Sequence, residues 1–200
     1  QTRQHLNCVL VDFARGAAIT TDGHRLAKAN SAACFDGAEP CWVPLDAWVQ
    51  TTKACPKKGG ILVTRSGSSV TLRAIDPGYV ILDAFGTDDG PTELDGWTKA
   101  RVDARCPDVQ FPSYDQIIPK LEAQHADTYE HRENGKGETR PRTKEAGFNA
   151  RYLGDIALVS DAAGAKGAAF HPGPGPLDPL LVVVSGPKGS WTVVVMPMRI

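Results

Sequence analysis

The apolar side chains of this sequence come in short runs that end at Gly, Pro or Asp, and two groups of runs follow the same order. Each group begins with a short strand-like segment, continues with a helical pattern and ends with three strand-like runs. The helical patterns lie at 44–52 and 149–163, and the runs that follow them lie at 61–64, 70–74 and 79–85, and at 168–170, 180–184 and 191–198. This repeat of strand, helix and three-stranded meander predicts an α+β fold with antiparallel sheets and few helices.

The two predicted helices have different boundary signals. The first begins at Pro44, which suits a first helical turn, and is stopped at 59–60 by two glycines. Its buried face is predicted from helical spacing to carry four side chains, those of Leu45, Trp48, Val49 and Thr52. The second begins after Asn149, a favoured N-cap residue, and ends at Gly164.

Three further strand-like runs, at 6–13, 17–21 and 26–29, precede the first group and resemble a shortened third copy. The chain begins at Gln1, which suggests that the missing strand and helix of this copy lie upstream. Residues 86–110 are rich in Asp, Gly and Pro and are predicted to form a loop. Residues 120–145 carry mixed charges with few large apolar side chains, so we expect a polar linker between a domain at 1–119 and one at 146–200.

Composition excludes several classes of protein. No apolar run reaches the roughly 18 residues that a membrane-spanning helix needs. With 22 basic and 23 acidic side chains the formal charge is −1, so any contact with nucleic acid must come from a local basic face. The five cysteines show no C-x-x-C spacing and are predicted to be small buried apolar residues in a reduced interior; they are Cys8, Cys34, Cys41, Cys55 and Cys106.

No motif points to a cofactor or a catalytic centre. Three histidines, at 125, 131 and 171, match no common metal-ligand spacing. The Gly-Lys-Gly at 135–137 lacks the upstream glycine and preceding strand of a phosphate loop, and the adjacent acids at 88–89 are poorly placed to converge on one substrate atom. No nucleophile elbow is present either. We therefore expect no metal, no cofactor and no enzymatic activity.

Four motifs occur in one order along the chain, at 6–10 with 21–27, at 111–119, at 148–153 and at 194–200. The last of them, VVMPMRI, stands at the extreme C-terminus. Together they resemble the bacterial sliding clamp, the beta subunit of DNA polymerase III. The resemblance covers the middle domain of that family over 1–119, without its opening strand and helix, and the second half of the last domain over 146–200.

The resemblance implies a DNA-clamp-like fold and a non-enzymatic scaffold. In the family, a groove between the middle and last domains receives short, partly apolar peptides from polymerases and repair proteins. Its residues, carried over motif by motif, would be Leu6, Thr21, Gly23, His24, Arg25, Leu26, Pro112, Ile117, Val194, Met196, Pro197 and Met198, with Arg199 at the rim.

The resemblance also implies contact with double-stranded DNA through phosphates rather than bases. The candidate cations are Lys53, Lys57 and Lys58 near the end of the first predicted helix and Arg151 at the start of the second. A processivity factor of this kind is a homo-oligomer located in the cytoplasm with the nucleoid. The alternative is a reduced relative that does not encircle DNA and acts as a regulatory or decoy peptide-binding module.

Overall fold

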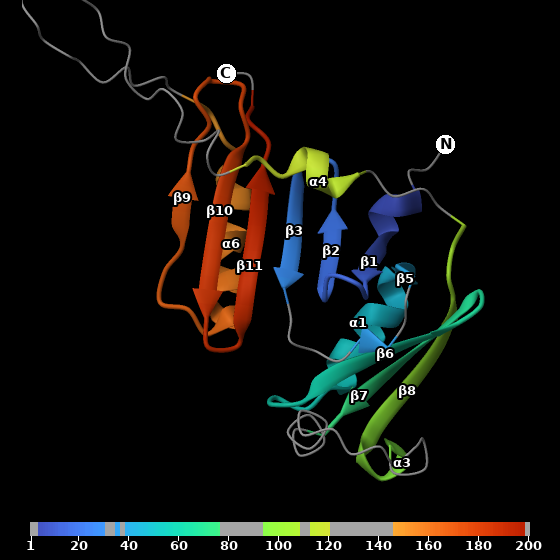
Figure 1. Cartoon of the computed structure of the whole chain (residues 1–200). Coiled ribbons are helices and arrows are strands. Elements are labelled where there is room, and N and C mark those ends of the chain that lie inside the picture. Colours follow the sequence, from blue (N-terminus) through green and yellow to red (C-terminus); the bar gives the residue numbers. More distant parts are fainter. Residues whose placement is uncertain are drawn as a thin grey trace, which may run out of the picture. The chain divides into compact units, whose positions relative to one another are not determined.

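The structure is a computed structural model that describes residues 4–30, 35–36, 39–76, 94–108, 113–120 and 146–198 (Figure 1). The chain forms two compact units. Unit 1 consists of Gln1–Thr20 and Asn30–Phe111, and unit 2 of Thr21–Ala29 and Pro112–Ile200. Segment Thr21–Ala29, which lies inside the first predicted domain, therefore groups with the C-terminal part of the chain. Except for Lys120, the predicted linker lies outside the described residues.

Unit 1 contains strands of two sheets and one long helix. Strands of the first sheet follow the order β5-β1-β2, and those of the second the order β4-β6-β7-β8, in which only the β4–β6 pair is parallel. The elements are η1 Gln4–Asn7, β1 Cys8–Asp12, β2 Ala17–Thr21, β4 Phe35–Asp36, β5 Cys41–Pro44, α1 Leu45–Ala54, β6 Gly60–Ser66, β7 Ser69–Ile75, α3 Leu94–Trp97 and β8 Thr98–Arg105.

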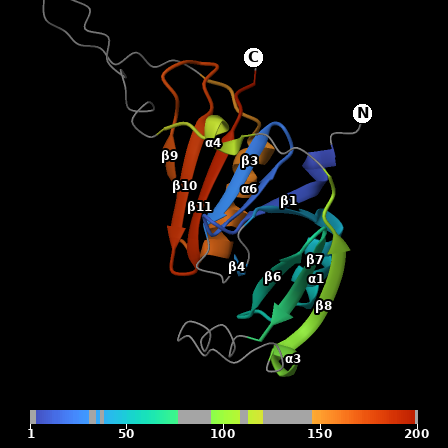
Figure 2. The ribbon, with the colours of Figure 1, turned by 45° about the vertical axis from the view of Figure 1, so that its right-hand side comes forward.

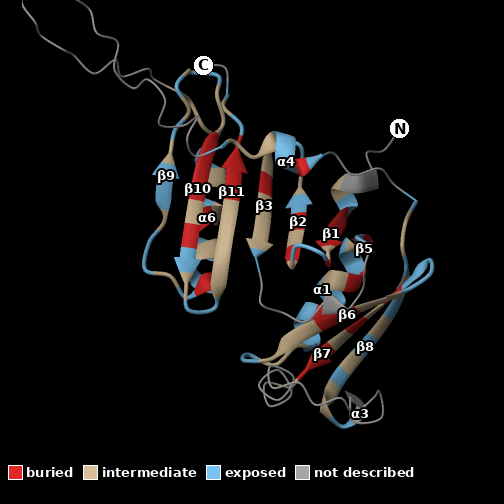
Figure 3. Ribbon diagram, viewed as in Figure 1, coloured by how far each residue is buried: buried red, intermediate tan, exposed pale blue. Residues whose placement is uncertain are grey.

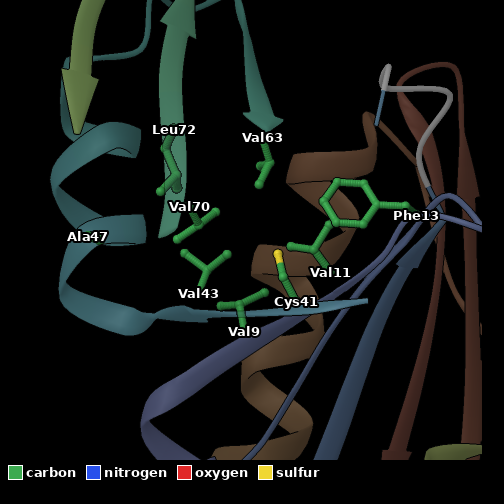
Figure 4. Packing of buried hydrophobic residues seen from close by; sticks show 9 residues of the cluster. All are labelled: Val9, Val11, Phe13, Cys41, Val43, Ala47, Val63, Val70 and Leu72. Carbon is green, nitrogen blue, oxygen red and sulfur yellow. The ribbon is translucent and has the colours of Figure 1, made fainter. Parts of the chain in front are cut away.

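The core of unit 1 lies where α1 and strands from both sheets meet. β-Branched residues suit this place because their side chains pack well on a pleated surface. Val11, Cys41, Val43, Val63 and their neighbours are buried and point toward one another (Figure 4). The buried cluster consists of Val9, Val11, Phe13, Cys41, Val43, Ala47, Val63, Val70 and Leu72.

Helix α1 begins at the predicted place but buries a different face. Ala47 and Thr51 are its buried residues, whereas Leu45 and Val49 are each 41% exposed. The predicted face was therefore wrong for Leu45, Val49 and Thr52, whereas Trp48 is half-buried and packs against the core as predicted. Spacing alone identified a stripe of larger apolar residues, but the helix packs close to the sheet through small side chains, and Thr51 donates its hydroxyl to the carbonyl of Ala47 at 2.9 Å.

Strand β8 corrects a second expectation, because Thr98–Arg105 lies within the predicted loop at 86–110. Its residues alternate strictly between half-buried and exposed. Ala100, Val102 and Ala104 occupy one face while charged side chains occupy the other, so the strand is readable from period-two alternation despite its low apolar content. The predicted strand at 79–85 lies outside the described residues.

Unit 2 contains four neighbouring strands in the order β3-β11-β10-β9, covered on one face by a helix (Figure 2). Helix α6 packs along β10 and β11 and buries Ile156 and Ala163 against Val182, Val184 and their neighbours. Figure 3 shows buried stretches in red on β10 and β11. The elements are β3 Arg25–Asn30, α4 Tyr114–Ile117, α6 Ala150–Ala163, β9 Ala169–His171, β10 Leu180–Gly186 and β11 Gly189–Val195.

The order of elements in the described part of the chain agrees with the predicted repeat, although the third strand of the first group is β8 rather than the predicted run at 79–85. In unit 1, β5 and α1 precede β6, β7 and β8. In unit 2, a bridge between Gly147 and Met198 stands where a first strand is expected, and α6 precedes β9, β10 and β11. The fold is thus α+β with mostly antiparallel sheets and few helices, as predicted.

Candidate functional site

The candidate site in unit 2 starts from the bend between β2 and β3. The Asp22 carboxylate accepts hydrogen bonds from the backbone N–H groups of His24 (2.9 Å) and Arg25 (3.0 Å). The Thr21 hydroxyl donates to the carbonyl of Arg25 at 2.8 Å and accepts from the N–H of Gly23 at 3.1 Å. Gly23 has φ of 88°, which side chains other than glycine rarely adopt. Local polar contacts therefore fix the shape of this bend.

Arg25 connects the bend to helix α6. Its Nε donates to Asp22 at 2.9 Å, its terminal nitrogen Nη1 pairs with Asp155, and its guanidinium lies 4.6 Å from the centre of the Tyr152 ring. Tyr152 and Asp155 are three residues apart on α6 and so lie on adjacent positions of one helix face. The cation is thereby held between two carboxylates and an aromatic ring.

The charges of this group stabilise one another. Hydrogen bonding to Asp155 is the largest cause that raises the pKa of Arg25, with Asp22 adding to it. Partial burial opposes ionisation of Asp22, but hydrogen bonds from His24 and Arg25 outweigh it and lower the pKa of the Asp22 carboxyl. The arginine therefore presents little uncompensated charge to a bound partner.

The bend also contacts the C-terminal strand. The carbonyl of His24 accepts a hydrogen bond from the N–H of Met196 at 2.9 Å, directly after β11 ends. The exposed His24 ring stacks near Tyr152, with 6.3 Å between the ring centres and 22° between the planes. The predicted proximity of the 21–26 bend to the terminal strand is confirmed, whereas a role in binding stays a prediction.

The terminal segment leaves two thioether side chains in solvent. Met196 is 40% and Met198 49% exposed, and Pro197 is half-buried. The N–H of Met198 donates to the carbonyl of Gly147 at 2.7 Å, which fixes the segment beside the start of α6. We name the surface formed by Asp22, His24, Arg25, Tyr152, Asp155, Met196 and Met198 the bend surface.

The other predicted peptide-site residues lie in different surroundings. Leu26 and Val194 are only 2% and 1% exposed, so they support the bend surface from below rather than offer area to a partner. Ile117 is half-buried in α4. Leu6 lies in η1 of unit 1. Two more predicted residues, Pro112 and Arg199, lie outside the described residues.

Three residues of the bend surface were missed as site residues: Asp22 in the bend itself, and Tyr152 and Asp155 on α6. Tyr152 lies within the 148–153 motif but was not singled out. The Asn149 side chain accepts a hydrogen bond from the N–H of Arg151 at 3.0 Å and so sets where α6 begins. The helix start in turn sets the positions of Tyr152 and Asp155 on the helix. The i, i+3 spacing of an aromatic and an acid after this cap was the available signal. Arg25 lies 130 residues from Asp155 in the sequence, a separation that spacing cannot reveal.

The predicted DNA-contacting cations are all exposed. Lys53 lies in the last turn of α1, and Lys57 and Lys58 follow it in the connection to β6. Arg151 lies in the first turn of α6, in unit 2. The structure therefore brings the three lysines into one region of unit 1, and their role in binding DNA stays a prediction.

The cysteines of the described residues form no disulfide bonds, and burial disfavours the reactive thiolate of three of them. Cys8 and Cys41 are buried, and burial raises the pKa of the Cys41 thiol to about 12. Burial also raises the pKa values of Cys8 and Cys55. Cys34 lies outside the described residues. Within the described ranges no three His, Cys, Asp or Glu side chains gather in a way that could hold a metal ion.

Among the described helices, none combines the length and the apolar character that a membrane span requires. No protein-family model matches the sequence, and no curated protein matches it significantly. Solved structures do match. The DNA polymerase III subunit beta of Pseudomonas aeruginosa superposes with a TM-score of 0.63 at 19% identity, covering 100% of this chain and 60% of that one.

The chain has the fold of a bacterial sliding clamp. The beta subunit of Thermotoga maritima agrees, with a TM-score of 0.61 at 16% identity over 98% of this chain and 58% of that chain. The Caulobacter crescentus subunit gives 0.60 at 20% identity over 100% and 59%. The chain thus spans about 60% of the length of these clamps, and the resemblance to a partial clamp is confirmed at the level of fold.

Proposed function

We propose that the chain is a non-enzymatic scaffold of the sliding-clamp type that docks short peptide motifs of DNA polymerases and repair proteins on the bend surface. The single observation that carries this proposal is the hydrogen bond from Met196 to the carbonyl of His24. It joins two segments from opposite ends of the sequence, both of which belong to motifs of the clamp family, beside the exposed methionine side chains.

The chemistry of the bend surface suits a partly apolar peptide. Methionine side chains are flexible and polarizable, so Met196 and Met198 adapt to anchors of different shape. Tyr152 and His24 provide ring faces, and Arg25 is neutralised by Asp22 and Asp155. Burial of an apolar anchor contributes about 1.5–3 kcal/mol, so two anchors support roughly micromolar affinity after the cost of association.

Structures of related clamps with ligands support this kind of site. One Caulobacter crescentus clamp carries polyethylene glycol at a region assigned to beta-motif tethering, and clamps of Pseudomonas aeruginosa and Bartonella birtlesii are bound to griselimycin. We propose that the ligand of the present chain is a short peptide. Pro112, Ile117 and Arg199 are proposed to extend the site beyond the bend surface.

A titration with a labelled clamp-binding peptide tests the proposal. We expect His24→Ala and Met196→Ala each to weaken binding about 10-fold or more, as loss of a contact worth about 1.4 kcal/mol requires. Leu158→Ala is the matched control, because Leu158 is 66% exposed on α6 and is not part of the bend surface. Equal affinity of the wild type and both site variants would contradict the proposal.

We further propose non-specific contact with double-stranded DNA through Lys53, Lys57, Lys58 and Arg151, in a cytoplasmic homo-oligomer. Light scattering and retention on circular but not linearised DNA test ring formation. A monomer that is lost equally from both DNA forms would contradict the ring.

A second candidate function, a peptide-binding relative that does not encircle DNA, is favoured by the surface of α6. Its solvent-facing residues include Gly154, Ala157, Leu158 and Asp161, and Arg151 is the helix's single cation. A helix that follows DNA phosphates normally presents several cations. Peptide binding together with a monomeric state and no retention on DNA would select this function over the first.

A further inference from the structure

The outward face of the β7–β8 ladder in unit 1 concentrates positive charge. Val70, Leu72 and Ala104 point to the other face, where α1 and the buried cluster lie. Antiparallel partners share a face. The outward face of β8 and its β7 partners therefore carries four cations and one acid, which we name the arginine face: Arg73, Lys99, Arg101, Asp103 and Arg105.

Two of these cations lie directly opposite one another. Arg73 of β7 pairs in register with Arg101 of β8, whereas Thr71 pairs with Asp103 and Ser69 with Arg105. Opposed side chains of an antiparallel pair have Cβ atoms about 5 Å apart, and like charges at this distance destabilise the sheet. A sheet keeps such a pair at low cost when an anion lies between the two guanidinium groups.

The protein compensates only part of this charge. Asp103 accepts hydrogen bonds from Arg101 at 3.0 and 3.1 Å and from the Thr71 hydroxyl at 2.5 Å, and these bonds lower the pKa of its carboxyl. Lys99 pairs with Asp76 at 3.1 Å. The Nε of Arg73 is shielded from solvent and has no hydrogen-bond partner among the described residues. One carboxylate thus serves two arginines, and Arg105 forms no ion pair with any described residue.

We propose that the arginine face binds the phosphate backbone of duplex DNA, with one phosphate bridging Arg73 and Arg101. Guanidinium groups present paired N–H donors that match phosphate oxygens, which a lysine cannot do. Arg105 lies four residues beyond Arg101 along β8, or about 13 Å at roughly 3.3 Å per residue. A single small phosphate cannot span this length, but the regularly spaced phosphates of a duplex can. Recognition is therefore independent of base sequence.

This surface differs from the helix-end cations considered above. Within unit 1, α1 and its Lys53 lie on the side of the sheet that faces the buried cluster, whereas the arginine face is on the opposite side. The two sets are therefore separable by mutation. The arginine face is also distinct from the bend surface, so the inference does not depend on peptide docking.

Fluorescence anisotropy of a labelled DNA duplex at about 50 and 200 mM salt tests the proposal. We expect Arg73→Gln with Arg101→Gln to lower affinity roughly 10- to 100-fold near 0.1 M salt. The slope of log affinity against log salt should become shallower by about 0.9, the value expected for loss of the one phosphate that the two arginines share. Arg73→Lys with Arg101→Lys should keep the slope and lose only part of the affinity, because charge remains without the paired donors.

The charge-matched control is Lys166→Gln with Lys188→Gln, two exposed lysines of unit 2 that belong to none of the proposed surfaces. We expect it to change affinity less than about 3-fold. The variant Lys57→Gln with Lys58→Gln measures separately how much the lysines that follow α1 contribute to DNA affinity. Retained melting temperature and peptide affinity show that each variant is folded.

Three results would overturn the proposal: wild-type protein that fails to bind duplex at the lower salt, equal affinity of the wild type and the arginine double variant, or equal losses in that variant and the lysine control. Competition by inorganic tripolyphosphate without any binding of duplex would likewise reject DNA as the ligand.

Discussion

The two long helices are stabilised in different ways. Helix α6 in unit 2 has 14 residues, an Asn149 side chain that caps its first turn and a left-handed Gly164 that closes its last. Helix α1 in unit 1 has 10 residues, no side-chain cap at Pro44 and an extended residue at its C-terminus. Local sequence therefore defines the ends of α6, while α1 depends on close packing of small residues against its sheets.

The largest expected effect concerns the buried side chains of the two helices. Ile156 is 4% exposed and anchors α6, so Ile156→Ala should cost about 2–5 kcal/mol through lost burial and a cavity. Ala47 is the corresponding contact of α1, and Ala47→Gly should cost only about 1 kcal/mol through helix propensity. Hydrogen exchange of segments 150–163 and 45–54 measures both changes. Equal losses of stability in Ile156→Ala and Ala47→Gly would contradict the proposed difference in how the two helices are stabilised.

The next effect concerns the closeness of α6 to the β10–β11 hairpin. A Cβ atom at Gly186 would collide with the backbone carbonyl of Ala163, and the N–H of Lys188 donates to that carbonyl at 3.1 Å. Gly186→Ala should therefore destabilise unit 2 by about 1–3 kcal/mol.

Gly154 is the control for this prediction, because a Cβ atom there meets open space on the exposed side of α6. Gly154→Ala should stabilise the helix by about 0.5–1 kcal/mol, since alanine restricts the unfolded chain and favours helix. Thermal unfolding measures the melting temperature of both variants, which should fall for Gly186→Ala and rise for Gly154→Ala. A destabilised Gly154→Ala protein would show that α6 packs against something on its outer side.

Loss of the α6 cap is expected to have a smaller effect. Asn149→Ala removes the acceptor for the N–H of Arg151 and should cost about 1 kcal/mol. Asn149→Ser should recover most of this loss, because serine is also a good cap. Exchange of the first-turn amides of α6 reports the change directly, and an alanine variant with unchanged exchange would show that packing alone defines the helix start.

The same contrast explains which parts of the structure were predictable. Asn149 and Gly164 carry local backbone preferences, so the ends of α6 followed from the sequence. The buried face of α1 did not, because the choice of Ala47 and Thr51 over Leu45 and Val49 is made by neighbouring strands. Strand β8 was missed because a loop composition around it masked its alternation.

For the candidate site, family motifs placed His24 and Met196 in one site, and the structure joins them by a hydrogen bond. The long-range partner Asp155 was not predictable, since an ion pair between residues far apart in sequence leaves no spacing signal. The arginine face has a similar origin. Its two opposed arginines belong to different strands, and only the register of β7 against β8 brings them together.

The smallest predicted effect is the pH dependence of the bend in unit 2. The folded pKa of Asp22 is lowered, so its carboxylate stabilises the fold above the unfolded value of about 3.9. This contribution is lost as the pH falls through the lower folded pKa. Asp22→Asn preserves the acceptor of the turn but removes the charge, and it should cost about 0.5 kcal/mol at neutral pH because Asp22 is 42% exposed and therefore screened.

Thermal unfolding between about pH 7 and pH 3 separates this effect from a general response to acid. The wild type should lose more stability than Asp22→Asn over this range, and the two curves should converge at the acid end. Asp103→Asn is the unit 1 control, because its pKa is also lowered but its carboxylate lies on the arginine face. It should leave exchange of the 21–26 amides unchanged. A loss of stability in acid that is as large for Asp22→Asn as for the wild type would contradict a role for the Asp22 charge. That result would show that the hydrogen bonds of the turn alone hold Arg25 against Tyr152.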